Sequence, residues 1–374
     1  GLFGSATARH LARRDIETVI IGPDEPAALS EHAGPFGAHY DEARILVARG
    51  DTPSVALTRL TIDGIARLEA AVGEALIVRS GGLEIGPGGG AAREIVDDIV
   101  AVPAGSARLE EPPPQGYFNP RRYITAALDD ATAHGAAIHR APVIDVHHSG
   151  GKFVLDCGQQ EVAADRVVVA AGAWSNRLLR RRVALRLKQE SVLFAELDES
   201  AASSVTMRPT VFHGRTGNVE DIYTLPPIRY PDGRWYLKLG ANTVHDRAAD
   251  PTRIDDWYRD GDSLAQADLE EAFRAVFPEV APRAFHLERC VITYTPHGRP
   301  FIAELDIPGL YIAAAGNGHG ASWADGVGEL AALLVNEEPW PADHENLEPE
   351  AFAVAYEDES PAWPGPLLLA DRIE

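Results

Sequence analysis

Cysteine, lysine and methionine are scarce in this chain of 374 residues. The two cysteines, Cys157 and Cys290, leave no basis for a disulfide framework, so we expect a reducing compartment, the bacterial cytoplasm. Lys152, Lys188 and Lys238 are the only lysines among 34 basic residues. Such heavy use of arginine is typical of a GC-rich bacterial genome, and it makes each lysine a candidate for a specific role.

Long apolar runs, a secretion signal and an excess of positive charge are also lacking. No stretch reaches the length of a membrane span and no signal peptide is visible, so we expect no membrane association. The formal net charge of −22 argues against nucleic acid and anionic membranes as partners, because both need a basic surface. No His, Cys, Asp or Glu residues have the spacing of a metal site, and no Gly-x-Ser-x-Gly motif indicates a hydrolase. We therefore expect no metal.

The stretch from residue 289 to residue 329 is the most informative part of what is present. It begins with Cys290 in the pattern Cys-x-x-Thr-x-Thr-Pro, continues as an apolar strand, and reaches the turn Gly316-Asn317-Gly318-His319-Gly320. A helix is predicted from near Trp323. A strand that leads through a glycine-rich turn into a helix directs backbone N–H groups at a ligand.

The first residues predict a second ligand-binding turn. Gly1-Leu2-Phe3-Gly4 enters a helix in the manner of the last two glycines of a Gly-x-Gly-x-x-Gly dinucleotide fingerprint, whose first glycine and strand would precede Gly1. A short buried strand follows at residues 17–21. Gly22-Pro23 then stands where an acidic residue normally binds the adenosine ribose, and either Asp24 or Glu25 could take that role.

Together, the cysteine motif and the Gly-x-Gly-His-Gly turn resemble the monomeric sarcosine oxidase family, FAD-dependent amine oxidases of the D-amino-acid-oxidase superfamily. The resemblance implies FAD as the cofactor, attached covalently through the sulfur of Cys290. Alternatively, Cys290 is an ordinary small buried residue. The strand at 166–171 ends in a turn that is similar to the family's second flavin-contacting turn. The cofactor-binding residues that the resemblance implies are Gly1, Gly4, Asp24, Val143, Gly172, Trp174, Cys290, Gly316, Gly318, His319 and Gly320.

The resemblance and the order of elements predict an α/β fold, in which a Rossmann-type FAD-binding domain is interleaved with an antiparallel, β-rich substrate domain. Residues 1–50, 115–185 and 286–345 would form the discontinuous FAD-binding domain. Residues 51–114 and 186–285 would form the substrate domain, and 346–374 a C-terminal tail. Helices are predicted at 53–73, 119–135 and 264–276; Pro120 suits a first helical turn.

Two basic residues are candidates for catalysis. Lys238 lies in an apolar run, at the place where the resemblance implies a lysine above flavin N5 that promotes reaction with O₂. Alternatively, it protects an edge strand. Arg44 lies where the family has an arginine close to the isoalloxazine ring. Alternatively, it is a surface arginine paired with Asp41 or Glu42.

The sequence departs from the family at positions that contact the substrate there. An arginine, a lysine and a histidine of the family are replaced by Val47, Ser322 and Asn242. Because a buried carboxylate needs a cationic partner, we expect sarcosine to be a poor substrate unless Arg49 reaches its carboxylate. The predicted substrate pocket consists of Tyr223, Asn242, Tyr294, Ser322 and Trp323, with Tyr117, Trp235 and Ile292 as further apolar lining. The aromatic residues among these could equally belong to the core.

These features predict an FAD-dependent oxidase that acts on the C–N bond of a secondary amine or amino-acid-like substrate. The products would be an imine and H₂O₂, and the partners would be the amine and O₂. His319 is assigned to the flavin-binding turn and not as a catalytic base, since no neighbouring acid orients it. A flavin-dependent dehydrogenase that passes electrons to a carrier, and a catalytically inactive flavoprotein, are the alternatives.

Overall fold

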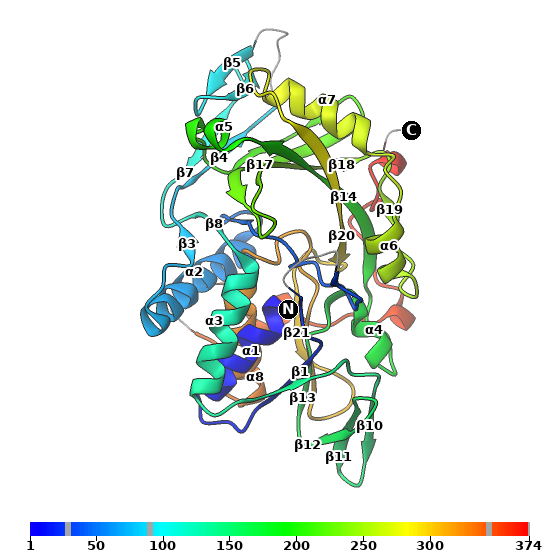
Figure 1. Ribbon diagram of the computed structural model, residues 1–374. Helices are drawn as coiled ribbons and strands as arrows, with labels where there is room; N and C mark the ends of the chain where they lie inside the picture. Colours follow the sequence, from blue (N-terminus) through cyan, green and yellow to red (C-terminus); the bar gives the residue numbers. More distant parts are fainter. Residues whose placement is uncertain (27–30, 88–92, 342–345, 373–374) are drawn as a thin grey trace.

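The computed structural model describes residues 1–26, 31–87, 93–341 and 346–372 (Figure 1). The α-helices are α1 (Leu2–Ala12), α2 (Thr52–Val72), α3 (Pro120–Ala133), α4 (Ser175–Leu178), α5 (Glu199–Ser204), α6 (Ile254–Asp260), α7 (Gln266–Val276) and α8 (Ala324–Val335). The predicted helices at 53–73, 119–135 and 264–276 correspond to α2, α3 and α7. Asn119 caps α3, because its side chain accepts hydrogen bonds from the backbone N–H groups of Arg121 and Arg122.

The strands form several separate sheets. One parallel pair is β1 (Val19–Gly22) with β9 (Ala137–Arg140); another is β13 (Val167–Val169) with β22 (Leu310–Ala314), which continues antiparallel to β21 (Phe301–Glu304). The smaller antiparallel groups are β10 (Asp145–Ser149), β11 (Lys152–Asp156) and β12 (Glu161–Ala164); β2 (Arg44–Leu46), β8 (Gly116–Phe118) and β3 (Ile77–Val78); and β5 (Arg93–Val96) with β6 (Val100–Pro103).

The largest sheet has nine strands and lies in the upper half of Figure 1. Its strands are β4 (Gly82–Ile85), β7 (Arg108–Glu111), β14 (Arg186–Leu197), β15 (Thr210–Phe212), β16 (Arg215–Thr216), β17 (Val219–Arg229), β18 (Trp235–Thr243), β19 (Arg247–Ala248) and β20 (Ala284–Tyr294). The strand that carries Cys290, β20, is paired along its whole length with β14. The division into domains drawn from the sequence stays a prediction.

Alternation along the central strands gives this sheet one apolar and one polar face. Leu193, Leu237 and Leu239 point to the side covered by α7, where they pack with Phe273. Residues on the other side include Lys238, and register places it beside Phe194 of β14. The polar face is the one that borders the cavity described below.

The helical layer is centred on α1, which packs against α3 and α8 (Figure 1). Gly328 allows α8 to approach closely, since a Cβ atom there would lie 2.3 Å from the Cβ of Ala6. The carboxylate of Asp325 in α8 is fully buried and accepts hydrogen bonds from Arg9 (2.7 Å) and Tyr123 (2.7 Å), with His10 at 2.8 Å. This charged network joins three helices directly below the predicted dinucleotide turn.

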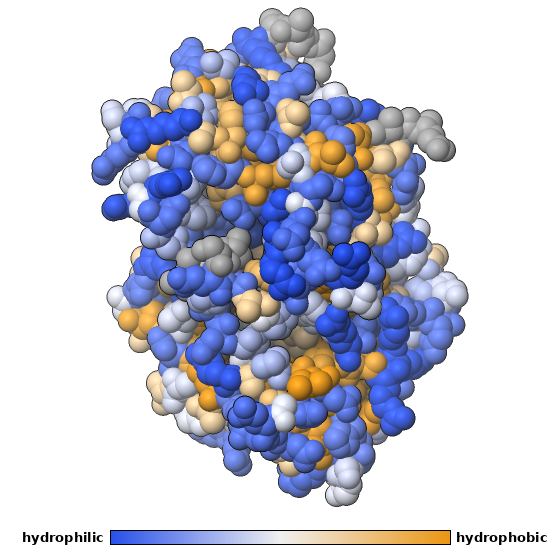
Figure 2. Space-filling view, turned by 45° about the vertical axis from the view of Figure 1, so that its right-hand side comes forward, coloured by the Kyte–Doolittle hydropathy of each residue, from blue (hydrophilic) through white to orange (hydrophobic). Residues whose placement is uncertain are grey.

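Within the described residues, no helix is both long and apolar enough to span a bilayer. On the face shown in Figure 2, hydrophilic residues predominate and hydrophobic residues form separate patches.

Candidate cofactor and substrate cavity

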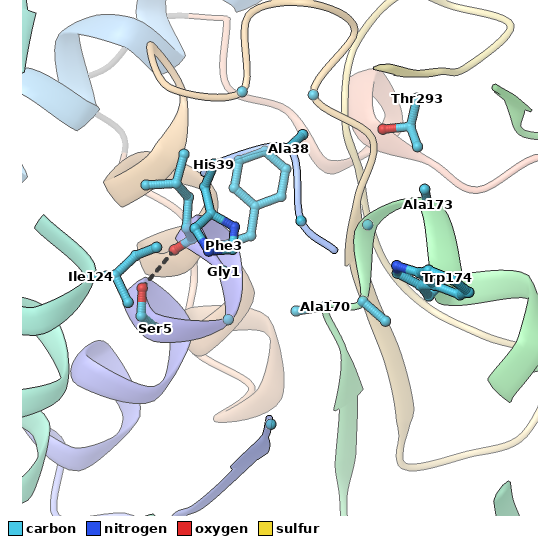
Figure 3. A pocket seen from close by; sticks show the side chains of 18 of the residues that line it. Gly1, Phe3, Ser5, Ala38, His39, Ile124, Ala170, Ala173, Trp174 and Thr293 are labelled. Atoms are coloured by element: carbon cyan, nitrogen blue, oxygen red, sulfur yellow. Dashed lines mark hydrogen bonds between the residues drawn. The ribbon is translucent and has the colours of Figure 1, made fainter. Parts of the chain in front are cut away.

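A cavity of about 1560 Å³ runs from the N-terminus of α1 to the polar face of the nine-stranded sheet. Figure 3 shows part of its wall, with Gly1, Phe3 and His39 on one side and Ala173 and Trp174 on the other. Pockets for drug-sized ligands occupy about 300–1,000 Å³, so this cavity has room for a large cofactor together with a substrate.

The N-terminus of α1 opens into this cavity. Gly1 is the N-cap residue and makes no side-chain hydrogen bond to the helix, so the first backbone N–H groups of α1 remain available to a ligand. Gly4 lies against β13, since a Cβ atom added to it would sit 3.3 Å from the Cβ of Ala170. Both glycines therefore suit an approach of a pyrophosphate to the helix end.

The two acidic candidates for the ribose differ in their surroundings. The Asp24 side chain is 79% exposed and pairs with Arg140 at 3.2 Å. Glu25 accepts a hydrogen bond from Arg121 (2.6 Å) and lies 2.5 Å from Nε2 of His39. Although burial opposes ionisation, His39 and Arg121 lower the pKa of Glu25 to about 2. Asp24 and Glu25 both line the cavity, but existing partners hold Glu25 in place.

The second predicted turn also borders the cavity. Val143, Gly172 and Trp174 all line it, and the indole N–H of Trp174 donates to the carbonyl of Phe36 at 2.9 Å. Gly172 has a positive φ of 55°, which glycine adopts without strain.

The third turn ties the cysteine strand to the start of α8. Asn317 donates its N–H to the carbonyl of Thr293 and accepts from the N–H of Thr295, both at 2.8 Å. Gly316 cannot be replaced without movement, because a Cβ atom would lie 2.8 Å from the Cα of Gly320. Gly316, Gly318, His319 and Gly320 all line the cavity.

His319 lies in this turn and stacks obliquely on Trp323, with the two ring centroids 5.2 Å apart. Burial, reinforced by Arg49, lowers the pKa of His319 to about 4. The ring is thus neutral at physiological pH. No side-chain hydrogen bond to an acid orients it within the described part of the chain, which agrees with leaving it out of the catalytic residues.

Cys290 is a free thiol on the cavity wall. It faces Glu190 across the β14–β20 pair, and its carbonyl accepts a hydrogen bond from Trp257 at 3.0 Å. Burial raises the pKa of the Cys290 thiol, although Arg44 acts against this. The thiol is therefore accessible from the cavity, as attachment to a cofactor would require.

Lys238 is a buried residue on an interior strand, so it does not protect a sheet edge. Its ammonium donates to Asp41 Oδ2 (2.6 Å) and to the carbonyl of Ala43 (2.9 Å). Arg44 also pairs with Asp41, and Tyr230 donates to the same carboxylate at 2.5 Å. Burial lowers the pKa of Lys238 to about 8, although Asp41 raises it.

Arg44 is paired with an acid, as one of its two sequence interpretations held, and its proximity to the isoalloxazine ring stays a prediction. Its side chain lines the cavity and is at the same time paired with Asp41. The carboxylate of Asp41 has a pKa well below its usual range: burial opposes this, but Arg44 and Lys238 together outweigh burial. One loop acid thus holds two cavity cations. The contact between Asp41 and Lys238 joins residues that are 197 positions apart in the chain.

Some of the predicted substrate residues line the cavity and others do not. Tyr223, Asn242, Tyr294, Ser322 and Ile292 line the cavity. Trp323, Tyr117 and Trp235 do not, which corrects the sequence-based pocket. Trp323 is 1% exposed and packs in the core between α2 and α8, because the chain enters α8 there and turns its ring away from the cavity. Trp235 packs at the margin of the apolar face of the large sheet.

The structure also shows the surroundings of Val47 and Arg49, two positions considered for binding a substrate carboxylate. Ser322 donates to the carbonyl of Ile45 at 3.3 Å, and Val47 is buried beside it. Arg49, the cation considered as a substitute, lines the cavity with Nε 3.1 Å from Oε1 of Glu84. It is therefore already matched by an acid.

Sequence reasoning missed a second charged cluster on the polar face. The ammonium of Lys188 lies 2.8 Å from Glu190, 3.2 Å from Asp246 and 2.6 Å from Oδ1 of Asn242. All three ionisable groups are buried. The scarcity of lysine was the available signal, but nothing in the sequence brought Asp246 next to β14.

One group of possible metal ligands lies away from the cavity. Atoms of His10, Asp325 and Glu329 lie within 4.8 Å of one another. The hydrogen bonds of Asp325 to Arg9, His10 and Tyr123 already account for this proximity, and we assign no metal to it.

The fold and cavity define a flavoprotein oxidoreductase. The chain matches the family model of the FAD dependent oxidoreductases (DAO) over residues 1–334, and it belongs to this family. It is similar to monomeric sarcosine oxidase from Bacillus sp. (strain NS-129), with 24% identity over 369 residues that cover 90% of each chain.

Solved structures share the fold. NikD, described as an unusual amino acid oxidase essential for nikkomycin biosynthesis, has a TM-score of 0.72 at 15% identity, with 95% of each chain covered. Amadoriase I from Aspergillus fumigatus, a fructosyl amine:oxygen oxidoreductase, has a TM-score of 0.71 at 16% identity, covering 94% of this chain and 88% of that one. The predicted fold class is confirmed, and so is the resemblance to the sarcosine oxidase group.

The residues present fit FAD. The helix end at Gly1 offers unpaired N–H groups, Gly316 leaves space where any side chain would collide, and the cavity is long enough to reach from α1 to Cys290. The protein is therefore an FAD-dependent enzyme, and this cavity is the candidate site for its cofactor and substrate.

Proposed function

We propose that this enzyme is an oxidase of the C–N bond of a secondary amine that carries no α-carboxylate, giving an imine and H₂O₂. The observation that carries the proposal is the composition of the cavity wall. Lys238 supplies a buried ammonium there, while Ser322 and Asn242 stand on the wall at positions expected to bind a substrate carboxylate. Val47, at the third such position, is buried beside Ser322 and does not line the cavity. We place the enzyme in a bacterial cytoplasm, in keeping with its two unpaired cysteines.

FAD, when bound, would supply the acceptor for a hydride equivalent from the carbon next to the amine nitrogen, and O₂ would take up the two electrons and two protons to give H₂O₂. The protein's own part begins with Lys238. An ammonium has three N–H donors, and Asp41 and Ala43 use two of them. The remaining donor and the positive charge are available to stabilise negative charge that develops when oxygen is reduced. Asp41 fixes the position of the ammonium and is a positioning residue.

Cys290 would hold the cofactor covalently. Its thiol lies on the cavity wall in β20, and the hydrogen bond from Trp257 fixes the backbone at that residue. Trp174, Gly172, Val143 and the turn at Gly316–Gly320 would surround the same cofactor. His319 would remain a neutral member of that turn.

Substrate binding would rely on the wall formed by Tyr223, Tyr294 and Ile292. Burial raises the pKa of Tyr294 to about 12, so its hydroxyl stays protonated and serves as a hydrogen-bond donor. A carboxylate in this region would have to displace Asp41 from Arg44, or Glu84 from Arg49. Asp41 would then keep only one of its two cations, and the half-buried Glu84 would lose its arginine, so either change is costly.

The test is anaerobic mixing of the purified flavoprotein with a panel of secondary amines, followed by addition of O₂ and measurement of H₂O₂. We expect carboxylate-free amines to bleach the flavin absorbance and O₂ to restore it with one H₂O₂ per turnover. Bleaching without reoxidation by O₂ would instead identify a dehydrogenase that needs an electron carrier. No bleaching by any member of the panel would identify a flavoprotein without this activity.

A further inference from the structure

We propose that Glu190 binds a second, positively charged nitrogen of the substrate, so that the enzyme acts on diamine-like molecules. This inference rests on the proposed amine oxidation and deepens it by naming the substrate class. Glu190 lies on β14, lines the cavity and is 6% exposed. A carboxylate enclosed to this degree is kept in a protein only when a cation or several donors satisfy it.

The internal partners of Glu190 leave it incompletely satisfied. Lys188 contacts Oε2 at 2.8 Å, and no other cation among the residues that the structure describes forms an ion pair with this carboxylate. Lys188 is also shared, because Asp246 lies 3.2 Å from the same ammonium. One lysine therefore serves two buried acids, and the cluster has a net charge of −1 when both are ionised.

Asp246 and Glu190 occupy different positions in this cluster. Asp246 accepts hydrogen bonds from the hydroxyl (2.8 Å) and the N–H (3.1 Å) of Thr243, so it closes the turn after β18. It does not line the cavity. Glu190 has no such structural hydrogen bonds and faces the space where a ligand would lie. The negative charge offered to a ligand is thus that of Glu190.

The surrounding residues also suit a cation. Tyr223 and Tyr294 line the cavity, and their ring centroids lie 5.8 Å from the Lys238 ammonium and 6.0 Å from the Lys188 ammonium. Aromatic faces at such distances attract positive charge. Asn242, which stands where the resemblance implies a histidine, contributes no positive charge and turns its oxygen to Lys188.

The position of Glu190 on the sheet points to a nitrogen other than the one that is oxidised. Lys238 pairs in register with Phe194, four residues from Glu190 on β14. At about 3.3 Å per residue, roughly 13 Å of strand separate the two backbone positions. A cation held by Glu190 would therefore be the far end of a substrate whose reacting nitrogen lies closer to Lys238.

The inference can be tested by ligand binding to the holoenzyme, followed through perturbation of the flavin spectrum under anaerobic conditions at a pH near 7. The probes are N-methyl-1,4-diaminobutane, N-methylpentan-1-amine, which replaces the second nitrogen by a methyl group, and 4-(methylamino)butanoate. Where a probe reduces the flavin, its dissociation constant is taken from the concentration dependence of the reduction rate.

We expect the wild-type protein to bind the diamine at least about 10-fold more tightly than the monoamine, and to bind the carboxylate compound most weakly. Glu190→Gln should abolish the preference for the diamine while leaving the dissociation constant of the monoamine within about twofold. The matched control is Asp246→Asn, which removes an acid from the same lysine but not from the cavity wall. It should weaken the preference less than Glu190→Gln does, because Lys188 then serves one acid fewer but the carboxylate on the cavity wall remains.

A Glu190→Gln variant that keeps the preference, or a wild-type protein that favours the carboxylate compound, would overturn the assignment. So would an equal loss of binding for diamine and monoamine, or an Asp246→Asn variant that behaves like Glu190→Gln. If Glu190→Gln fails to retain flavin, Glu190→Asp replaces it, and a preference that does not decrease there overturns the assignment as well. Failure of the proposed oxidation appears separately, as Glu190-dependent binding of a diamine that never reduces the flavin.

Discussion

The two ends of the cavity are built in different ways. At the proposed cofactor end, the wall consists of backbone: the start of α1 and the turns around Gly172 and Gly316. At the sheet end, it meets charged side chains on neighbouring strands, grouped around Lys238 and Lys188. Backbone sites depend on local glycine patterns, whereas side-chain sites depend on which strands are neighbours. The backbone site for the cofactor can therefore stay the same while substitutions change the side-chain site to suit another substrate.

The two lysine clusters at the sheet end differ in turn. Lys238 and Arg44 share Asp41, which gives two positive charges and one negative charge. Lys188 is shared by Glu190 and Asp246, which gives the opposite balance. When these acids are ionised, one polar face carries an excess of positive charge at one place and an excess of negative charge at another, and burial, which raises the pKa of Glu190, opposes the second. This polarity would orient an amine with a second basic group.

The largest expected effect concerns the cofactor end of the cavity, where Cys290 is proposed to hold the flavin covalently. Cys290→Ser should convert a flavin that stays with acid-precipitated protein into one that is fully released to the supernatant, because the proposed thioether can no longer form. Absorbance of the two fractions measures this. Cys157→Ser is the control and should retain the flavin, since Cys157 is buried away from the cavity. Release of all the flavin from the wild-type protein would rule out the covalent bond, though not FAD binding.

The charged network below the cofactor end should dominate stability. Asp325→Ala removes the shared partner of Arg9, His10 and Tyr123 and leaves buried polar groups unmatched. We expect a loss of about 3–5 kcal/mol in the free energy of unfolding, measured by urea denaturation. The exposed Asp129→Ala variant in α3 should change it by less than about 0.5 kcal/mol. A loss below about 1 kcal/mol for Asp325→Ala would show that the network is not important for stability.

Lys238→Met tests the positive cluster. It should slow flavin reoxidation by O₂ about 10²–10³-fold, equivalent to about 3–4 kcal/mol, while anaerobic reduction by the amine changes little. Stopped-flow absorbance measures both half-reactions. The exposed Lys152→Met variant should change neither, because that ammonium pairs with Asp165 and belongs to β11, which is not part of the nine-stranded sheet. Equal losses in both half-reactions would indicate that Lys238 has only a structural role.

The same cluster predicts a pH dependence. Because burial lowers the pKa of Lys238 to about 8, the ammonium is charged below that pH and neutral above it. The reoxidation rate should therefore fall as pH rises through 8, approaching about tenfold per pH unit, whereas an ordinary lysine would keep the rate constant to about pH 10. Lys238→Met should lose this step in the profile. A wild-type rate that is independent of pH between 7 and 9.5 would contradict the assignment.

The contrast between the two ends also explains what could be predicted from the sequence. Local patterns located the turn at Gly316, the apolar strand before it and the start of α3 near Pro120, because each depends on residues next to one another in the chain. The confirmed fold class follows from the same motifs. The contact between Asp41 and Lys238 could not be predicted from the sequence, because it depends on how a loop packs against a strand that is distant in the chain.

The contacts of the candidate substrate residues were also only partly predictable from the sequence. Lys188 and Glu190 are neighbours on one strand and could be seen to share a face, but their partner Asp246 comes from the end of another strand. Both Ser322 and Trp323 were predicted to line the substrate pocket. Ser322 does line the cavity, but the side chain of Trp323 is buried in the core. In a buried polar face, one step along the chain separates a ligand contact from a packing residue.

The measurement that tests the central claim most directly is the rate of anaerobic flavin reduction by N-methylpentan-1-amine and by sarcosine, compared in one preparation. With Val47, Ser322 and Asn242 in place of cations, a bound α-carboxylate would be buried without a partner, which costs several kcal/mol. We predict that the second-order rate constant for sarcosine is lower by about 100-fold or more. Reduction by sarcosine as fast as by the carboxylate-free amine would contradict the account.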